Sequence, residues 1–167
     1  METNQKNQLI IKREFKASMQ DVFNAFSSAE ALSQWWGSAG VPIVVEKFEF
    51  APKGVFHYRA SMQGQTIWGK FVFGQINKFN LLEFTSSFAN EKGDVIRAPF
   101  SEQFPMEIFN RLEFAEQSGK TTITLIGYPV NATDEEKQFF ASMEQGMQQG
   151  FAGTFMQLEN YLSKQKS

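Results

Sequence analysis

Few residues of this sequence could act as an acid, a base or a nucleophile near neutral pH. Cysteine is absent and His57 is the single histidine, so thiolate chemistry and cysteine-ligated metal sites are excluded. An unperturbed histidine titrates near neutral pH and is a common general base. On an extended segment, however, His57 would point away from the face that carries Phe56 and Tyr58, and outward if those rings face an interior. No carboxylates stand near it at the spacing of a metal site.

Two other groups resemble functional signatures but have simpler structural interpretations. Residues 119–121 (Gly-Lys-Thr) resemble the end of a phosphate-binding loop, but Phe114 stands where that motif needs its first glycine. We interpret them as a hairpin turn. The acidic residues 134–136 would occupy the positively polarised first turn of a helix that begins after Thr133. We therefore predict no catalytic residue, no metal site and no cofactor.

Phenylalanine dominates the apolar composition. The 167 residues include 19 Phe, 3 Trp and 3 Tyr, so aromatic residues make up 15% of the chain. A chain of this length is typical of one domain and can bury a substantial core. The charges nearly balance, with 16 Lys and Arg against 18 Asp and Glu. This balance argues against a nucleic-acid partner, which needs a basic surface to displace counterions.

The sequence also indicates a compartment. Residues 1–8 are polar and carry no apolar signal segment. No apolar run approaches the ~20 residues that a membrane-spanning helix needs. We therefore expect a cytoplasmic protein without a membrane span.

The hydrophobic pattern predicts a strand, two short helices, about six more strands and a long helix. Alternating apolar residues predict strands over residues 9–17, 41–50, 55–62, 66–77, 81–87, 104–114 and 121–128. Ser18 and Ser27 are predicted to cap the two short helices, the second of which covers residues 29–36. Residues 88–103 hold charges, Gly and Pro, and we interpret them as a long loop. Short turns between strands imply antiparallel pairing, with the helices at the ends of the chain.

The last segment is predicted to form one long amphipathic helix. Thr133 and Glu136 have the spacing of a capping box. Apolar residues then recur every three or four positions on one stripe: Phe140, Met143, Met147, Phe151, Phe155, Leu158 and Leu162. Gly146, Gly150 and Gly153 interrupt this helix, each at a cost of about 1 kcal/mol relative to alanine. Either they allow close approach to the sheet or leave room for a ligand, or they mark a bend.

Several local motifs follow one another in a fixed order. They are residues 22–26 (Val-Phe-Asn-Ala-Phe), the pair Trp35-Trp36, Gly54 before Phe56 and Tyr58, residues 69–76 (Gly-Lys-Phe-Val-Phe-Gly-Gln-Ile), and Gly150-Phe151 with Leu158 and Tyr161-Leu162. In this order they resemble the helix-grip superfamily of START domains, polyketide cyclases and plant-allergen-like proteins. Within it, the chain resembles the branch named for the activator of heat-shock-protein-90 ATPase. That branch commonly has an arginine and two glycines where this chain has residues 51–54 (Ala-Pro-Lys-Gly).

The resemblance implies an α+β helix-grip fold, in which a curved antiparallel sheet of about seven strands surrounds a long C-terminal helix. It implies a single START-like domain over residues 9–162, two short helices after the first strand, and polar tails at residues 1–8 and 163–167. We expect a ligand pocket between the sheet and the last helix. Its expected lining is Trp35, Trp36, Phe56, Tyr58, Phe71, Phe73, Phe84, Met106, Ile108, Met143, Met147, Phe151 and Phe155. Ordinary core packing is the alternative for such aromatic stripes.

Three function hypotheses follow, and the fold does not choose among them because the superfamily hosts all three. The first is a binding protein for a small hydrophobic or aromatic molecule, such as a lipid or a polyketide-like compound. The second is a cyclase or hydrolase that uses the same cavity with polar groups drawn from Tyr58, Glu83, Asn110 or Tyr128. The third is a co-chaperone-like interaction with the chaperone that the branch name implies. A homodimer is compatible with each of them.

Overall fold

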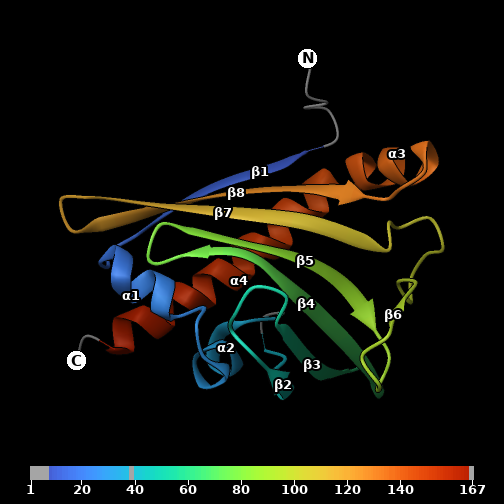
Figure 1. Ribbon diagram of the computed structural model, residues 1–167, viewed down its shortest axis with the longest axis horizontal. Coiled ribbons are helices and arrows are strands. Elements are labelled where there is room, and N and C mark those ends of the chain that lie inside the picture. The colour runs from blue at the N-terminus through green and yellow to red at the C-terminus, as the bar shows by residue number, and fades with distance from the viewer. Residues whose placement is uncertain (1–7, 38–39, 166–167) are drawn as a thin grey trace.

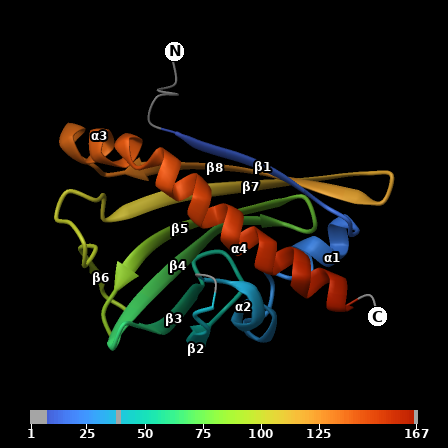
Figure 2. The same cartoon turned by 180° about the vertical axis from the view of Figure 1, so that it is seen from behind.

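The computed structural model describes residues 8–37 and 40–165, and within them it has the predicted α+β helix-grip architecture (Figure 1). One curved antiparallel sheet forms a single layer, and the long helix α4 (Glu144–Gln165) runs across one of its faces, as Figure 2 shows from behind. The short helices α1 (Met19–Asn24) and α2 (Ala29–Trp35) follow the first strand. None of the helices in the described ranges is long and apolar enough to cross a membrane.

The sheet is open, with β1 and β2 at its two edges. The strands are β1 (Leu9–Phe15), β2 (Ile43–Phe48), β3 (Val55–Met62), β4 (Gln65–Asn77), β5 (Leu81–Ala89), β6 (Val95–Ile96), β7 (Glu107–Gln117) and β8 (Lys120–Val130). Their order across the sheet is β1-β8-β7-β5-β4-β3-β2, with β6 paired to the end of β5. The predicted loop over residues 88–103 is therefore wrong in part. Its first two residues extend β5, and residues 95–96 add a short strand.

Serine side chains begin both short helices, although the second prediction is off by one residue. The Ser18 hydroxyl accepts from the Asp21 backbone N–H at 3.0 Å, as expected. The second cap is Ser28, which accepts from the Ala31 N–H at 3.1 Å, and not Ser27. The Ser27 N–H instead bonds the Asn24 carbonyl at 3.1 Å. Ser27 therefore belongs to the turn that follows α1, and Ser28 begins the next helix.

The predicted single C-terminal helix is two helices, α3 (Asp134–Ser142) and α4. The capping box of Thr133 and Glu136 is present. The break falls at Met143, whose N–H bonds the Phe140 carbonyl at 3.1 Å in a tightened last turn. Because the apolar stripe continues past Met143 on the same side, the hydrophobic period gives no sign of the break.

The glycines of α4 do not mark the break, and they do not bring the helix close to the sheet. A Cβ built at Gly146, Gly150 or Gly153 meets no atom within 4 Å. The interpretation as close approach is therefore wrong. The bend occurs before the first of them, at Met143.

The two halves of α4 meet different surroundings. In its second half, Phe155 is 1% exposed and meets Phe15 of β1 edge-on at 5.8 Å between ring centroids. Leu158 and Leu162 are also buried there. Near its N-terminal end, Met147 and Phe151 are only partly buried. The solid core therefore lies beneath the second half of α4, and the first half covers a different kind of space.

Candidate ligand-binding cavity

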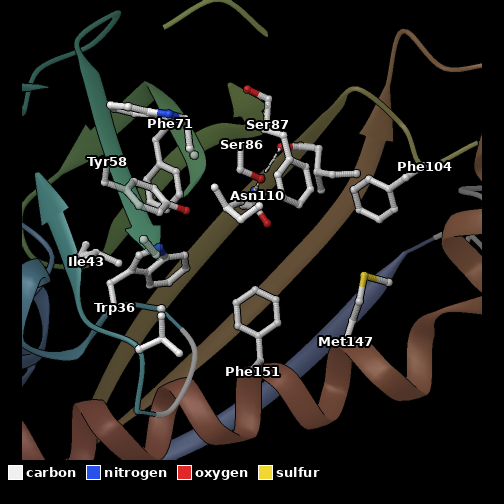
Figure 3. Close-up of a pocket in the computed structure, with 18 of the residues that line it drawn as sticks. Trp36, Ile43, Tyr58, Phe71, Ser86, Ser87, Phe104, Asn110, Met147 and Phe151 are labelled. Atoms are coloured by element: carbon white, nitrogen blue, oxygen red, sulfur yellow. Dashed lines mark hydrogen bonds between the residues drawn. The ribbon is translucent and has the colours of Figure 1, made fainter. Parts of the chain in front are cut away.

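A cavity of about 300 Å³ lies between the first half of α4 and the strands β3, β4, β5 and β7 (Figure 3). This is at the lower end of the volumes typical of small-molecule sites, about 300–1,000 Å³. Most of its lining is aromatic or aliphatic, and no charged side chain lines it among the residues that the structure describes. Met62, which is 40% exposed, also lines it and is the end residue of β3. An uncharged, largely apolar surface of this kind suits a neutral apolar ligand.

The adjacent residues Trp35 and Trp36 divide between the core and the cavity. Trp35 is 1% exposed, and its indole N–H donates to the Ala25 carbonyl at 2.9 Å. Trp36 follows the end of α2 with an extended backbone, and its ring lines the cavity. The two rings meet edge-on at 5.6 Å. Packing against Trp35 thus holds Trp36 as one wall of the cavity.

The strand wall is built from rings that support one another. Phe71 faces the cavity and meets the Trp36 ring edge-on at 5.2 Å. Behind it, Phe84 stacks on Phe71 at 4.0 Å with an interplanar angle of 13°. From the helix side, Phe151 approaches Trp36 at 6.4 Å. Because such contacts restrict each ring, this wall is largely preformed.

Tyr58 brings a hydroxyl group to this apolar wall. Its ring lies over Gly69 of the neighbouring strand, with which it pairs across the β3–β4 ladder. Figure 3 shows its oxygen pointing into the cavity. Burial raises the pKa of the phenol above its ordinary value, and a hydrogen bond from Trp36 partly opposes this. The hydroxyl therefore stays neutral and serves as a hydrogen-bonding group.

Asn110 is the second polar group and lies on the otherwise apolar face of β7. It is 5% exposed, and its Nδ2 donates to the Ser86 hydroxyl and to the Ile108 carbonyl, both at 3.1 Å. A longer contact of 3.5 Å reaches the Phe84 carbonyl. Since backbone carbonyls only accept hydrogen bonds, the amide nitrogen must face them and Oδ1 must face the other way. In Figure 3 this oxygen points into the cavity.

The segment between β5 and β7 closes one end of the cavity. Phe104 lines the cavity and packs near Phe88 of β5 and Phe140 of α3, with ring centroids 6.2 and 6.4 Å apart. Arg97 anchors the same segment, because its guanidinium donates to the Phe104 carbonyl and to the Glu136 carboxylate. The capping hydrogen bond from Thr133 and the ion pair with Arg97 lower the pKa of Glu136.

Comparison with known proteins is consistent with this architecture. The model of the family described as "Activator of Hsp90 ATPase homolog 1-like protein" matches residues 16–163, which is most of the chain. The chain belongs to this family. The predicted resemblance to the START-like superfamily, and to this branch of it, is thereby confirmed. No functionally curated protein matches the chain.

Solved structures with the same fold come from several bacteria. A protein from Arthrobacter aurescens superposes with a TM-score of 0.79 at 24% identity, over 98% of this chain and 90% of that one. A protein from Mycobacterium smegmatis gives 0.77 at 18% identity, over 99% and 96%. The AHSA1 protein from Silicibacter pomeroyi gives 0.69 at 16% identity, over 95% and 99%. At these identities the likeness concerns the fold alone.

Six of the thirteen residues expected in the pocket line the cavity of this family member. They are Trp36, Tyr58, Phe71, Ile108, Met147 and Phe151. Five others belong to the buried core around it: Trp35, Phe56, Phe73, Phe84 and Phe155. Met106 precedes β7, and Met143 is the C-cap of α3, so neither reaches the cavity.

His57 lies on the face opposite the cavity, as its alternation with Phe56 and Tyr58 predicts, but it is not exposed. The imidazole is 6% exposed, stacks on Trp68 at 4.9 Å, and its Nε2 is 3.0 Å from the Asn90 carbonyl. The turn that follows β5 covers it, which strand alternation does not show. No group of three His, Cys, Asp or Glu side chains that could hold a metal occurs in the described ranges.

The polar groups considered for catalysis separate between the two faces of the sheet. Tyr58 and Asn110 line the cavity. Glu83 pairs with Arg111 at 2.7 Å, and Tyr128 packs against Phe109 at 5.4 Å, and neither reaches the cavity.

Sequence reasoning did not place Ser86, Phe88 or Phe104 in the site, although all three line the cavity. Ser86 and Phe88 alternate with the predicted residue Phe84 along one face of the strand, and this alternation could have indicated both of them. Phe104 depends on the path of a loop, for which the sequence carries no comparable signal.

Proposed function

We propose that this protein binds a small, neutral, predominantly apolar molecule in the cavity between α4 and the sheet. The observation that carries the proposal is an uncharged cavity of about 300 Å³ with walls of aromatic rings. Apolar surface that stays accessible to solvent forgoes the stabilisation that burial would give, about 25 cal/mol for each Å². A chain that keeps such a space while packing its core tightly nearby is best explained if the space is filled in use.

Binding fits the lining better than acid–base catalysis. A cyclase or hydrolase needs a proton acceptor and a proton donor that converge on one substrate. Among the described residues the cavity offers only neutral polar groups, chiefly the Tyr58 phenol and the Asn110 amide, with the hydroxyl-bearing residues Ser86 and Ser87. The carboxylate of Glu83 lies elsewhere. Storage, transport or sensing of a ligand is therefore our proposal. A chaperone partner, a homodimer and a cytoplasmic location stay predictions.

Uptake of small apolar compounds by the purified protein tests this function directly. Native mass spectrometry should detect a bound compound after incubation with neutral aromatic probes, and the ligand should raise Tm. Ala60→Leu adds a larger side chain to the cavity wall and should abolish uptake. Ala115→Leu, on the exposed part of β7, should leave uptake unchanged. Equal uptake by wild type and Ala60→Leu, or no uptake of any probe by wild type, would overturn the proposal.

A further inference from the structure

Within that proposed function, we infer that the ligand carries a neutral hydroxyl group, alcohol or phenol, which donates a hydrogen bond to Asn110 Oδ1 and accepts one from the Tyr58 hydroxyl. This inference rests on the cavity being a binding site and names the chemical class of its occupant. It follows from the orientation of two polar groups in a largely apolar space.

The Asn110 amide is held so that its acceptor faces the cavity. The two N–H groups are turned toward Ser86 Oγ and the Ile108 carbonyl, both 3.1 Å from Nδ2. On the other side, a Cβ built at Gly127 of β8 would lie 3.2 Å from Oδ1. Oδ1 accepts no hydrogen bond from any residue that the structure describes. Asn110 is nonetheless more than nine-tenths buried, so protein atoms surround most of its side chain.

An acceptor in that position calls for a donor. A buried polar atom without a hydrogen-bond partner loses its hydration without compensation. In the free protein, solvent that enters the cavity can supply the donor. A ligand that fills the cavity and excludes solvent must supply it instead, which selects for an O–H or N–H group on the ligand.

The Tyr58 side chain narrows this choice to a hydroxyl. The phenol oxygen can both donate and accept, and Trp36, which lines the same space, offers only an N–H donor. The phenol hydrogen is therefore available for an acceptor on the ligand. A hydroxyl group both donates and accepts through one oxygen, so it satisfies both protein groups. Both protein oxygens point into the same space in Figure 3.

The lining also sets the charge of the ligand. No Lys, Arg or His side chain lines the cavity in the described part of the chain. A carboxylate or phosphate brought inside would lose its hydration without a counter-charge, which is strongly unfavourable. The same surface therefore excludes fatty-acid anions and phosphorylated compounds and favours neutral hydroxylated ones.

Three naphthalene probes of similar size separate this inference from the proposed function. Calorimetry should show that the wild type binds 2-naphthol about tenfold more tightly than 2-methoxynaphthalene, which equals about 1.4 kcal/mol. It should bind 2-naphthoate more weakly than either. If neither neutral probe binds, the proposed function fails. If both bind equally, or if 2-naphthoate binds best, the function stands and the inference is overturned.

Variants assign the preference to the two residues. Asn110→Leu keeps the side-chain volume but removes the acceptor, so the preference for 2-naphthol should fall to within about twofold while the ether still binds. Tyr58→Phe should weaken both neutral probes, because both carry an acceptor oxygen. Asn77→Leu, an exposed position of β4, is the matched control and should behave as wild type. A preference that survives in folded Asn110→Leu would overturn the assignment. If that variant does not fold, the wild-type probe series still decides.

Discussion

The Tyr58 ring occupies the space that a side chain at Gly69 would need. A Cβ built at Gly69 would lie 2.4 Å from Tyr58 Cζ and 2.5 Å from its hydroxyl oxygen. The two residues are direct cross-strand partners of β3 and β4. Glycine at this position thus lets the phenol lie flat against the strand, and the flat phenol leaves the cavity open. The glycine of the family-like motif over residues 69–76 therefore has a steric role at the site.

We predict that Gly69→Ala closes part of the cavity. The new Cβ must displace the Tyr58 ring, and the cavity is the open space beside it. Ligand affinity, measured by calorimetry with 2-naphthol, should fall about tenfold, and the variant should lose about 1–3 kcal/mol of unfolding free energy.

Gly74→Ala is the control for this prediction because it is the same change on the same strand. Its Cβ would meet the nearest atom, Glu83 Cβ, at an ordinary 3.4 Å. It should leave ligand affinity unchanged. If the Gly69→Ala protein bound the ligand as tightly as the wild type, the Tyr58 ring would have moved aside without entering the cavity.

We predict that two phenylalanines one turn apart on α4 differ sharply in their contribution to stability. Phe155 is in the solid core, so Phe155→Ala should cost about 3–5 kcal/mol in chemical denaturation. Phe151 faces the cavity and is only partly buried, so Phe151→Ala should cost about 1 kcal/mol. Ligand affinity should fall more in Phe151→Ala than in Phe155→Ala, once the Phe155→Ala protein is confirmed to be folded. Equal losses of stability would mean that the space beside Phe151 is packed as core.

The fold was predictable because it depends on short-range patterns. Strand alternation, caps and turn residues gave the order of elements, and the order of weak motifs gave the superfamily. The cavity was less predictable, because a hydrophobic stripe identifies the face of a helix and not what that face meets. Phe151 and Phe155 lie on one stripe of α4, but only Phe151 reaches the cavity.

The residues that give the cavity its polarity show the same limit. Asn110 was visible in the sequence as the one polar residue on the apolar face of its strand. The direction of its amide depends on carbonyls of β5 and β7 that only the folded sheet brings together. The burial of His57 likewise depends on a turn more than 30 residues away in sequence, through Asn90.

We predict that ligand binding changes tryptophan fluorescence through Trp36. Its ring lines the cavity, whereas Trp35 is enclosed in the core. Trp68 also borders the cavity, but its ring stacks on His57 on the opposite face of the sheet. The change produced by 2-naphthol should therefore vanish in Trp36→Phe and persist in Trp68→Phe. Calorimetry on both variants distinguishes a lost signal from lost binding. A change that persists undiminished in Trp36→Phe would place the ligand elsewhere.

We predict that acid weakens the ion pair by which Glu136 of α3 holds the segment before β7. The capping hydrogen bond with Thr133 and the ion pair with Arg97 hold the pKa of this carboxyl below its ordinary value. A carboxyl whose pKa is lower in the folded than in the unfolded protein stabilises the fold above the unfolded value. That stability is lost as the pH falls through the folded value.

The stability difference between wild type and Glu136→Gln tests this attachment. It should be about 1 kcal/mol at pH 7, since Arg97 is partly exposed and its ion pair is screened. The difference should decline as the pH falls below the ordinary range of a glutamate carboxyl, about 4.3, and the wild-type carboxyl becomes protonated. Glu135→Gln alters an exposed carboxylate in the same helical turn and should show a smaller difference at every pH. A difference for Glu136→Gln that stayed constant throughout the acid titration would show that its charge does not hold the segment, and that only the cap does.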